Sequence, residues 1–206
     1  MGRAGVFLDR DGTIIEEVGY LDAVDRLRLL PGAAEAIRLL NEAGLVTIVI
    51  SNQSGVARGY FSEQIVRDTN ARLASALAGE GARLDAIYYC PHHPDFGPPE
   101  LRVACDCRKP ATGMIARGAG AFGLDAARSY VVGDKPTDVA CARGAGATGI
   151  LVRTGYGDSE PPEQSGHDPV APDHEATDLF EAASWIISRE QGQGASHGGR
   201  NTACKT

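Results

Sequence analysis

Near its beginning the chain reads AGVFLDRDGT, residues 4–13. An apolar run that stops at charged residues and a glycine is typical of a buried strand followed by a tight turn, so a strand is predicted at residues 4–8. Similar runs predict further strands at residues 45–50, 86–89, 130–132 and 149–152. Helical patterns separate these runs, and the alternation predicts an α/β fold with a doubly wound, Rossmann-like parallel sheet.

Helices are expected between the strands. Residues 33–43 carry apolar side chains at helical spacing, with Pro31 before them and Gly44 just after them, which are ordinary start and stop signals. Further helices are predicted at about residues 62–77, after Pro110, after Pro136 and around residues 179–186.

The length of 206 residues, with 43% hydrophobic and 23% charged residues, is typical of one globular domain. We expect this domain over residues 1–190, with a surface loop at 158–173 and a disordered tail at 191–206. No apolar run approaches the roughly 20 residues of a membrane-spanning helix, and the N-terminus shows no export signal. A net charge of −7 disfavours nucleic acid as a partner. The sequence therefore predicts a cytoplasmic protein without membrane or nucleic-acid partners, and we expect a monomer.

Two aspartates follow the first predicted strand, and they are the strongest chemical signal in the chain. Asp9 and Asp11 are two residues apart at a glycine-containing turn. Like charges this close are costly unless a cation lies between them, and oxygen ligands beside a phosphate suit Mg²⁺. An aspartate can also attack phosphorus while a second carboxyl group moves a proton. The pair therefore predicts metal-dependent phosphoryl transfer, with an ordinary strand-end turn as the alternative.

Polar motifs also follow the other predicted strands. The second strand leads into Ser51-Asn52-Gln53-Ser54, which offers donors to a phosphoryl oxygen. The pair Arg108-Lys109 precedes the third predicted helix and offers two cations. The fourth strand ends in Asp134-Lys135, where the aspartate could complete a metal site. Each motif alone is compatible with a turn or a helix start, but their order along successive strand ends favours one joint site.

Thiols and imidazoles are concentrated between the second and third of these motifs. Cys90, His92, His93, Cys105 and Cys107 fall within eighteen residues. Three thiolates and one imidazole can form a closed, tetrahedral zinc site, which would supply ordering energy to a loop without a core of its own. Spacing alone does not decide between the two histidines.

The ordered motifs over residues 4–155 resemble the haloacid dehalogenase superfamily of phosphotransferases. The resemblance implies that Asp9 is the nucleophile and Asp11 the general acid and base. It also implies that Asp9, the backbone carbonyl of Asp11, and Asp134 hold Mg²⁺, and that Ser51 and Lys109 stabilise the transferred phosphoryl group.

The zinc loop, at about residues 90–107, makes the chain similar to the D,D-heptose 1,7-bisphosphate phosphatase subgroup. This resemblance implies a structural zinc ion on Cys90, His92, Cys105 and Cys107. It implies substrate contacts from Glu17, Val18, Gly19, Tyr20, Ser51, Asn52, Gln53, Ser54, Arg108, Lys109 and Lys135.

The implied reaction is removal of the 7-phosphate from D-glycero-D-manno-heptose 1,7-bisphosphate through an aspartyl-phosphate, on the route to nucleotide-activated heptose for lipopolysaccharide. The alternatives are a histidinol-phosphate phosphatase and, from another class, a non-catalytic zinc-binding module. Only about eighteen residues separate Thr13 from Pro31. That length is too short for a large cap domain, so an open site is expected.

Overall fold

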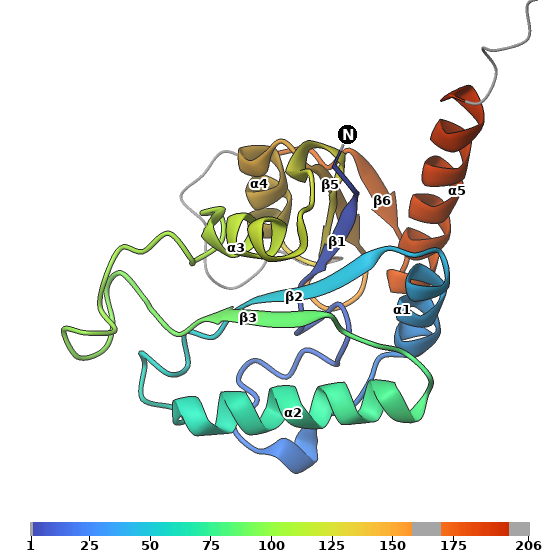
Figure 1. Cartoon of the computed structure of the whole chain (residues 1–206). Helices are drawn as coiled ribbons and strands as arrows, with labels where there is room; N and C mark the ends of the chain where they lie inside the picture. Colours follow the sequence, from blue (N-terminus) through green and yellow to red (C-terminus); the bar gives the residue numbers. More distant parts are fainter. Residues whose placement is uncertain (1, 158–169, 198–206) are drawn as a thin grey trace, which may run out of the picture.

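A computed structural model describes residues 2–157 and 170–197. Its core is one parallel sheet of six strands in the order β3-β2-β1-β4-β5-β6 (Figure 1). The strands are β1 (Gly5–Leu8), β2 (Val46–Asn52), β3 (Ala86–Cys90), β4 (Tyr130–Gly133), β5 (Thr148–Val152) and β6 (His174–Ala176). The predicted doubly wound α/β fold is therefore confirmed, and each of the five predicted strands is present.

In the described residues four α-helices connect successive strands from β1 to β5, and a fifth follows β6. They are α1 (Ala33–Glu42), α2 (Glu63–Gly79), α3 (Gly113–Phe122), α4 (Pro136–Ala145) and α5 (Leu179–His197), with two short 3₁₀ turns, η1 (Val24–Arg26) and η2 (Ala126–Arg128). Helix α5 includes residues 191–197, which the sequence analysis assigned to a disordered tail. Glu190, just before this stretch, accepts a hydrogen bond of 2.7 Å from the hydroxyl of Tyr130, which holds the helix beside β4 as far as this point. The rest of that predicted tail, and the predicted surface loop at 158–169, lie outside the described residues.

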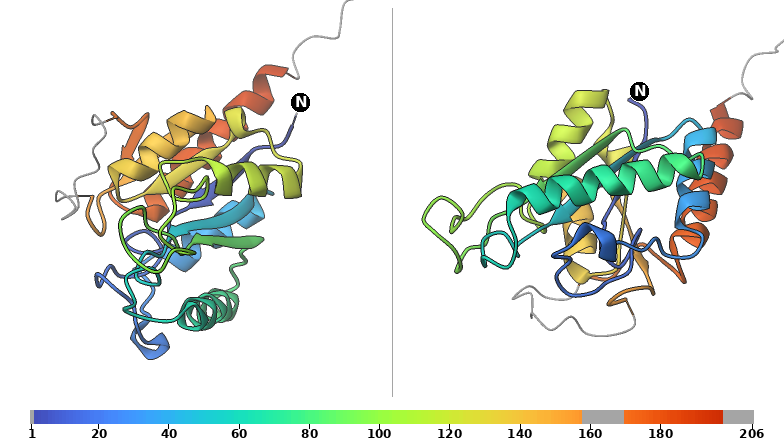
Figure 2. Two further views of the ribbon diagram at one scale, coloured as in Figure 1. Left: turned by 90° about the vertical axis from the view of Figure 1, so that its left-hand side faces the viewer. Right: turned by 90° about the horizontal axis from the view of Figure 1, so that it is seen from below.

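The helices cover both faces of the sheet, as Figure 2 shows from two further sides. Successive side chains of a strand point to opposite faces. In β1, Val6 and Leu8 pack with the buried side chains of α1, α2 and α5, whereas Phe7 packs with those of α3 and α4. All three are fully buried, and burying such a side chain stabilises the fold by roughly 1.5–3 kcal/mol.

The direction of the chain changes at β1. Leu8 pairs with Val49 of β2 on one side and with Val132 of β4 on the other. The chain builds β1, β2 and β3 outward and then returns to place β4 against β1. In parallel sheets ligands bind at the carboxyl ends of the strands beside such a switch. Residues that follow β1 and β4 are therefore placed to form a site.

Two connections shape this end of the sheet. Between Thr13 and Pro31 the chain forms loops and the short turn η1, which confirms the expectation that no large cap domain is inserted there. Between β3 and α3 a long loop extends away from the sheet (Figure 1). None of the helices in residues 2–157 and 170–197 is both apolar and long enough to cross a membrane.

Candidate active site

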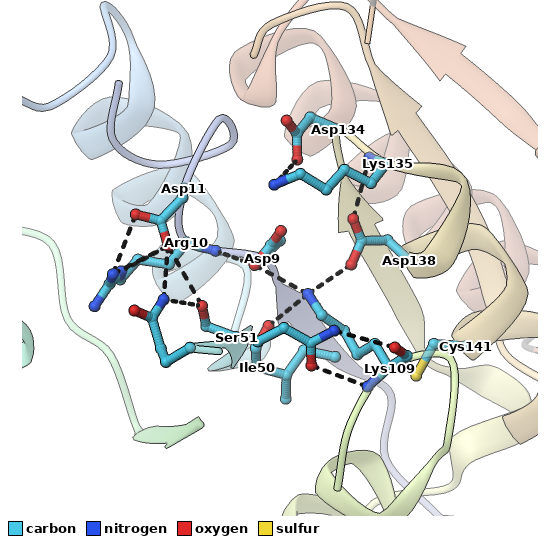
Figure 3. Close-up of polar contacts among 12 residues, drawn as sticks. Asp9, Arg10, Asp11, Ile50, Ser51, Lys109, Asp134, Lys135, Asp138 and Cys141 are labelled. Atoms are coloured by element: carbon cyan, nitrogen blue, oxygen red, sulfur yellow. Dashed lines mark hydrogen bonds and ion pairs between the residues drawn. The ribbon is translucent and has the colours of Figure 1, made fainter. Parts of the chain in front are cut away.

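Three buried carboxylates meet at the carboxyl end of the sheet, and we call them the acidic cluster. Asp9 follows β1, Asp134 follows β4, and Asp138 lies in the first turn of α4. One oxygen from each lies within 4.8 Å of the others, and the residues are 4%, 0% and 1% exposed (Figure 3). Negatively charged carboxylates that lie this close together and are buried away from water repel one another. The cluster therefore requires cations.

Asp134 is the member best suited to a metal ion. Its Oδ2 accepts a hydrogen bond of 2.9 Å from the backbone N–H of Tyr156, whereas its Oδ1 is buried without a hydrogen-bond partner. Burial raises the pKa of Asp134 to about 7, Lys135 opposes this shift, and the charges of Asp9 and Asp138 add to it. A bound divalent cation would satisfy the unpaired oxygen and favour the charged form.

Two glycines make room for the Asp134 carboxylate. Gly12 and Gly155 both have positive φ angles, of 81° and 57°. A Cβ atom at either position would collide with Asp134 Oδ2. The Asp-Gly turn after β1 thus serves geometry as well as chemistry, because only glycine allows both the turn and the close approach.

Lys109, which precedes α3, brings a positively charged group to the acidic cluster. Its Nζ lies 2.9 Å from Asp9 Oδ1 and 2.6 Å from Asp138 Oδ1, and it donates to the carbonyl of Ile50 at 2.9 Å (Figure 3). Burial by itself would lower the pKa of Lys109, but the charges of Asp138 and Asp9 outweigh it and raise the pKa. Lys109 therefore remains protonated and is positioned to neutralise charge near Asp9.

Asp138 was missed by the sequence analysis. Its Oδ1 pairs with Lys109, and its Oδ2 accepts a hydrogen bond of 3.1 Å from the backbone N–H of Lys135, within a capping box at the start of α4. A helix start with Pro136 and an acidic residue two positions later was visible in the sequence, but it indicated only a cap. Because both of its oxygens are engaged, Asp138 acts here as a partner that orients Lys109.

The carboxylate of Asp11 faces away from the acidic cluster. Arg10 donates to both of its oxygens at 3.1 Å, Gln53 Nε2 donates at 2.8 Å, and Ser51 Oγ lies 3.5 Å away (Figure 3). Burial would raise the pKa of Asp11, but the charge of Arg10 outweighs it and holds the pKa below its ordinary value. Of the two aspartates, only Asp9 places its side chain in the cluster.

A cleft of about 940 Å³ opens beside these residues, with Asp11 and Lys109 in its wall. Most of the predicted substrate-binding residues also line it: Glu17, Gly19, Tyr20, Asn52, Gln53, Ser54, Arg108, Lys109 and Lys135. Val18 and Ser51 are not among the lining residues. Val18 is 38% exposed, and Ser51 is buried and accepts a hydrogen bond of 2.8 Å from Gln53 Nε2.

Lys135 lines the cleft and lies within reach of the acidic cluster. Its Nζ pairs with Glu17 at 3.0 Å, lies 3.7 Å from Asp134 Oδ1 and approaches the ring of Tyr156 at 5.0 Å. Burial would lower its pKa, but the charges of Asp9, Asp134 and Glu17 raise it. The side chain is a fixed positive charge at the boundary between cleft and cluster.

Asn52 faces the cleft, but its amide is occupied by the protein itself. Its Nδ2 donates to the carbonyl of Lys109 and its Oδ1 accepts from the backbone N–H of Lys109, both at 3.0 Å. Asn52 also pairs with Cys90 in the β2–β3 register. Asn52 therefore holds the backbone of Lys109 against the carboxyl end of β2.

A second group of possible metal ligands lies at the base of the long loop, and we call it the cysteine cluster: Cys90, His92, Cys105 and Cys107. The three Sγ atoms are 3.1–3.5 Å apart, and His92 Nδ1 lies 3.3 Å from Cys107 Sγ and 3.6 Å from Cys90 Sγ. Three sulfurs and one nitrogen at such spacing fit a tetrahedral ion. Burial raises the pKa of Cys90, so a bound cation would be needed to hold its thiolate.

The structure separates the two histidines that spacing left open. His92 belongs to the cysteine cluster. His93 instead accepts from the backbone N–H of Asp95 at 3.0 Å and packs against the ring of Phe96 in the wall of the cleft. The neighbouring residue Arg108 lies beside the cluster, with its guanidinium 3.4 Å from the carbonyl of His92.

A parallel α/β sheet with the acidic cluster and the buried Lys109 at its switch point is the arrangement that the resemblance to the haloacid dehalogenase superfamily led us to expect. A family model described as "HAD-hyrolase-like" matches residues 106–182. The D-glycero-D-manno-heptose-1,7-bisphosphate 7-phosphatase of Thermosynechococcus vestitus is 47% identical over 195 residues, which cover 91% of this chain and 97% of that protein. The chain belongs to this phosphatase family within the haloacid dehalogenase-like hydrolases.

Other relatives agree with this assignment. The D-glycero-beta-D-manno-heptose-1,7-bisphosphate 7-phosphatase of Escherichia coli K12 is 39% identical, over 89% of this chain and 87% of that protein. The crystal structure of D,D-heptose 1,7-bisphosphate phosphatase from B. bronchiseptica, complexed with magnesium and phosphate, has a TM-score of 0.78 at 31% identity, and covers 90% of this chain and 99% of that one.

Proposed function

We propose that this chain hydrolyses the 7-phosphate of D-glycero-D-manno-heptose 1,7-bisphosphate, on the route to nucleotide-activated heptose. The observation that carries the proposal is the 47% identity to a phosphatase of that name over nearly the whole of both chains. The cleft supports it, because Lys109, Lys135 and Arg108 offer positive charge to a small phosphorylated sugar. We further propose that the protein acts in the cytoplasm as a monomer, without nucleic acid or membrane as partner.

In the first step, an oxygen of Asp9 attacks phosphorus and the bond from phosphorus to the sugar oxygen breaks. Asp11 donates a proton to that oxygen as the sugar leaves. In the second step Asp11 takes a proton from water, the water oxygen bonds to phosphorus, and the bond to Asp9 breaks, which releases phosphate. Lys109 lies 2.9 Å from Asp9 and would stabilise charge on the phosphoryl oxygens, together with Ser51.

Asp11 must carry a proton to act first as an acid. Its present contacts with Arg10 and Gln53 favour the carboxylate, which is the form needed for the second step. An incoming phosphate dianion would favour the protonated form by repulsion. The proton therefore enters the site with the substrate or on its arrival.

Asp9, Asp134 and the backbone carbonyl of Asp11 would hold Mg²⁺, which supplies positive charge that offsets the carboxylate and phosphate oxygens when bound. Asp134 fits this part because its Oδ1 is buried and accepts no hydrogen bond, with the ammonium group of Lys135 3.7 Å away. For the cysteine cluster we propose Zn²⁺, since three thiolates and an imidazole suit that ion and leave no open position for chemistry.

The test is a phosphate-release assay with Mg²⁺ on both anomers of the bisphosphate and on histidinol phosphate. The expected product retains its 1-phosphate and has lost its 7-phosphate, as read by ³¹P NMR. We expect kcat/KM for histidinol phosphate to be lower by at least about tenfold, because the contacts made by a second phosphate are absent. The proposal would be contradicted if neither anomer released phosphate, or if kcat/KM were higher for histidinol phosphate than for both anomers.

A further inference from the structure

Arg10 lies between the two catalytic aspartates in sequence, yet it has no part in the proposed chemistry. Its side chain is the largest fully buried one in the described residues, at 1% exposed. A buried guanidinium is costly unless its nitrogens are paired. Nε and one terminal nitrogen form a two-pronged contact with the carboxylate of Asp11, each at 3.1 Å. This contact fixes both the position and the plane of the carboxylate.

The remaining terminal nitrogen of Arg10 is held from a distant part of the chain. It donates to Oδ1 of Asn70 at 2.9 Å. Asn70 lies in the middle of α2, sixty residues away in sequence, and does not line the cleft. The guanidinium is thus held at both ends, by Asp11 on one side and by a helix on the other.

Asn70 is an unusual choice for its place in α2. It is 8% exposed on the buried face that also carries Val66, Leu73 and Leu77. Asparagine is a poor residue for a helix interior, and a leucine there would continue the apolar face. The hydrogen bond to Arg10 explains why a polar side chain occupies the position, because it satisfies a buried charge.

An acid–base carboxylate works only when its oxygen is aimed at the proton it transfers. Asp11 has two supports, Arg10 and Gln53, that approach from different elements. Without Asn70, the guanidinium would keep its charge but lose the contact that fixes its orientation. The two-pronged contact of Arg10 with Asp11 would then have no anchor on α2, so the plane of the Asp11 carboxylate would be held less firmly.

We propose that Asn70 is a positioning residue, which aims Asp11 at the leaving oxygen of the substrate through Arg10. The inference rests on the proposed function, because it assigns Asp11 the proton transfer described above. Asn70 touches neither substrate nor metal. Its effect should therefore depend on how much the leaving group needs a proton.

The test compares two substrates in variants of Asn70. The leaving group of the sugar bisphosphate is a sugar alkoxide, which needs a proton, whereas that of 4-nitrophenyl phosphate is a stable phenolate, which needs none. In N70L we expect kcat/KM to fall about tenfold or more for the sugar bisphosphate and less than about threefold for the aryl phosphate. N70D keeps an oxygen for Arg10 and should recover most of the sugar activity. N70A serves as a second variant, since alanine favours the helix if leucine prevents folding.

T69V is a matched control from the same helix. Thr69 is 1% exposed, and its hydroxyl has no hydrogen-bond partner within the described residues. We expect this variant to leave kcat/KM unchanged on both substrates. Equal losses on both substrates in N70L and N70A would indicate a merely structural role and would overturn the inference, as would unchanged activity on the sugar bisphosphate. If the wild type turned over neither substrate, the proposed function itself would fail and this inference with it.

Discussion

The acidic cluster and the cysteine cluster each bring together several metal-binding side chains, but the fold supports them differently. The members of the acidic cluster follow β1 and β4 or begin α4, and Lys109 already balances part of their charge. In the cysteine cluster only Cys90 belongs to a strand, and the other three members lie in the long loop after β3. The first site is therefore held by the sheet, whereas we expect the second to hold its loop through an ion.

The largest effect on activity should come from replacing Asp9, the proposed nucleophile, in the site that the sheet holds. We expect Asp9→Asn to lower kcat by at least about 10⁴-fold, because no other group can form the covalent intermediate. The thermal midpoint should not fall, since one of three clustered like charges is removed. Phosphate release and a melting curve measure the two effects, with Asp25→Asn on the exposed turn η1 as a control. Residual turnover within tenfold of the wild type would contradict the role of Asp9.

A variant of the cysteine cluster should instead lower thermal stability clearly and reduce activity less than the Asp9 variant does. Cys107→Ser should abolish the zinc binding that we propose for the cysteine cluster and lower the melting temperature, by on the order of 10 °C, because the loop would lose the ion proposed to order it. We expect kcat/KM to fall by about 10- to 100-fold as well, since Arg108 and Lys109 directly follow this residue. Elemental analysis, melting curves and kinetics measure these changes.

Cys141→Ala is the matched control for that variant. Cys141 is buried, at 1% exposed, but does not belong to the cysteine cluster. Its loss should leave the zinc content unchanged. Wild-type zinc content in Cys107→Ser would contradict the ligand assignment.

A smaller loss of activity is expected when Asn52, which connects the acidic cluster with the cysteine cluster, is replaced. Asn52 clamps the backbone of Lys109 and pairs with Cys90 of the cysteine cluster. We expect Asn52→Ala to lower kcat by about tenfold, since Lys109 loses part of its placement against Asp9. Its zinc content should stay at the wild-type level. If KM rose and kcat did not change, Asn52 would be a substrate contact and not a clamp.

The smallest effect concerns the pH dependence of stability. Burial raises the pKa of Asp134 to about 7, far above the ordinary value of roughly 4. A raised pKa favours the protonated folded form, so its contribution to stability is present in acid and is lost as the pH rises through about 7. Mg²⁺ should therefore raise the melting temperature of the metal-free protein more at pH 8 than at pH 6, by a few degrees. Equal shifts at both pH values, or the same difference in Asp134→Asn, would count against this account.

Much of this architecture could be predicted from sequence because its signals are local. The strand that leads to Asp9 shows itself as an apolar run with a glycine turn, and the density of cysteines marks the loop site. Asp138 resembled a helix cap, and its ion pair with Lys109 depends on how α4 and the segment before α3 come together in the fold. The bond between Arg10 and Asn70 joins residues sixty positions apart, and no local pattern announces it.

The short connection between Thr13 and Pro31 affects which acceptor takes the phosphoryl group from Asp9. The two candidates are water and the hydroxyl group of a bound alcohol or sugar. A hinged cap at this point would exclude bulk solvent and let a bound alcohol or sugar capture the group. This segment contributes no such cap, so it supplies no element that would close over the cleft and keep water from the proposed aspartyl-phosphate. An open rim at this position thus favours hydrolysis over transfer to a second sugar.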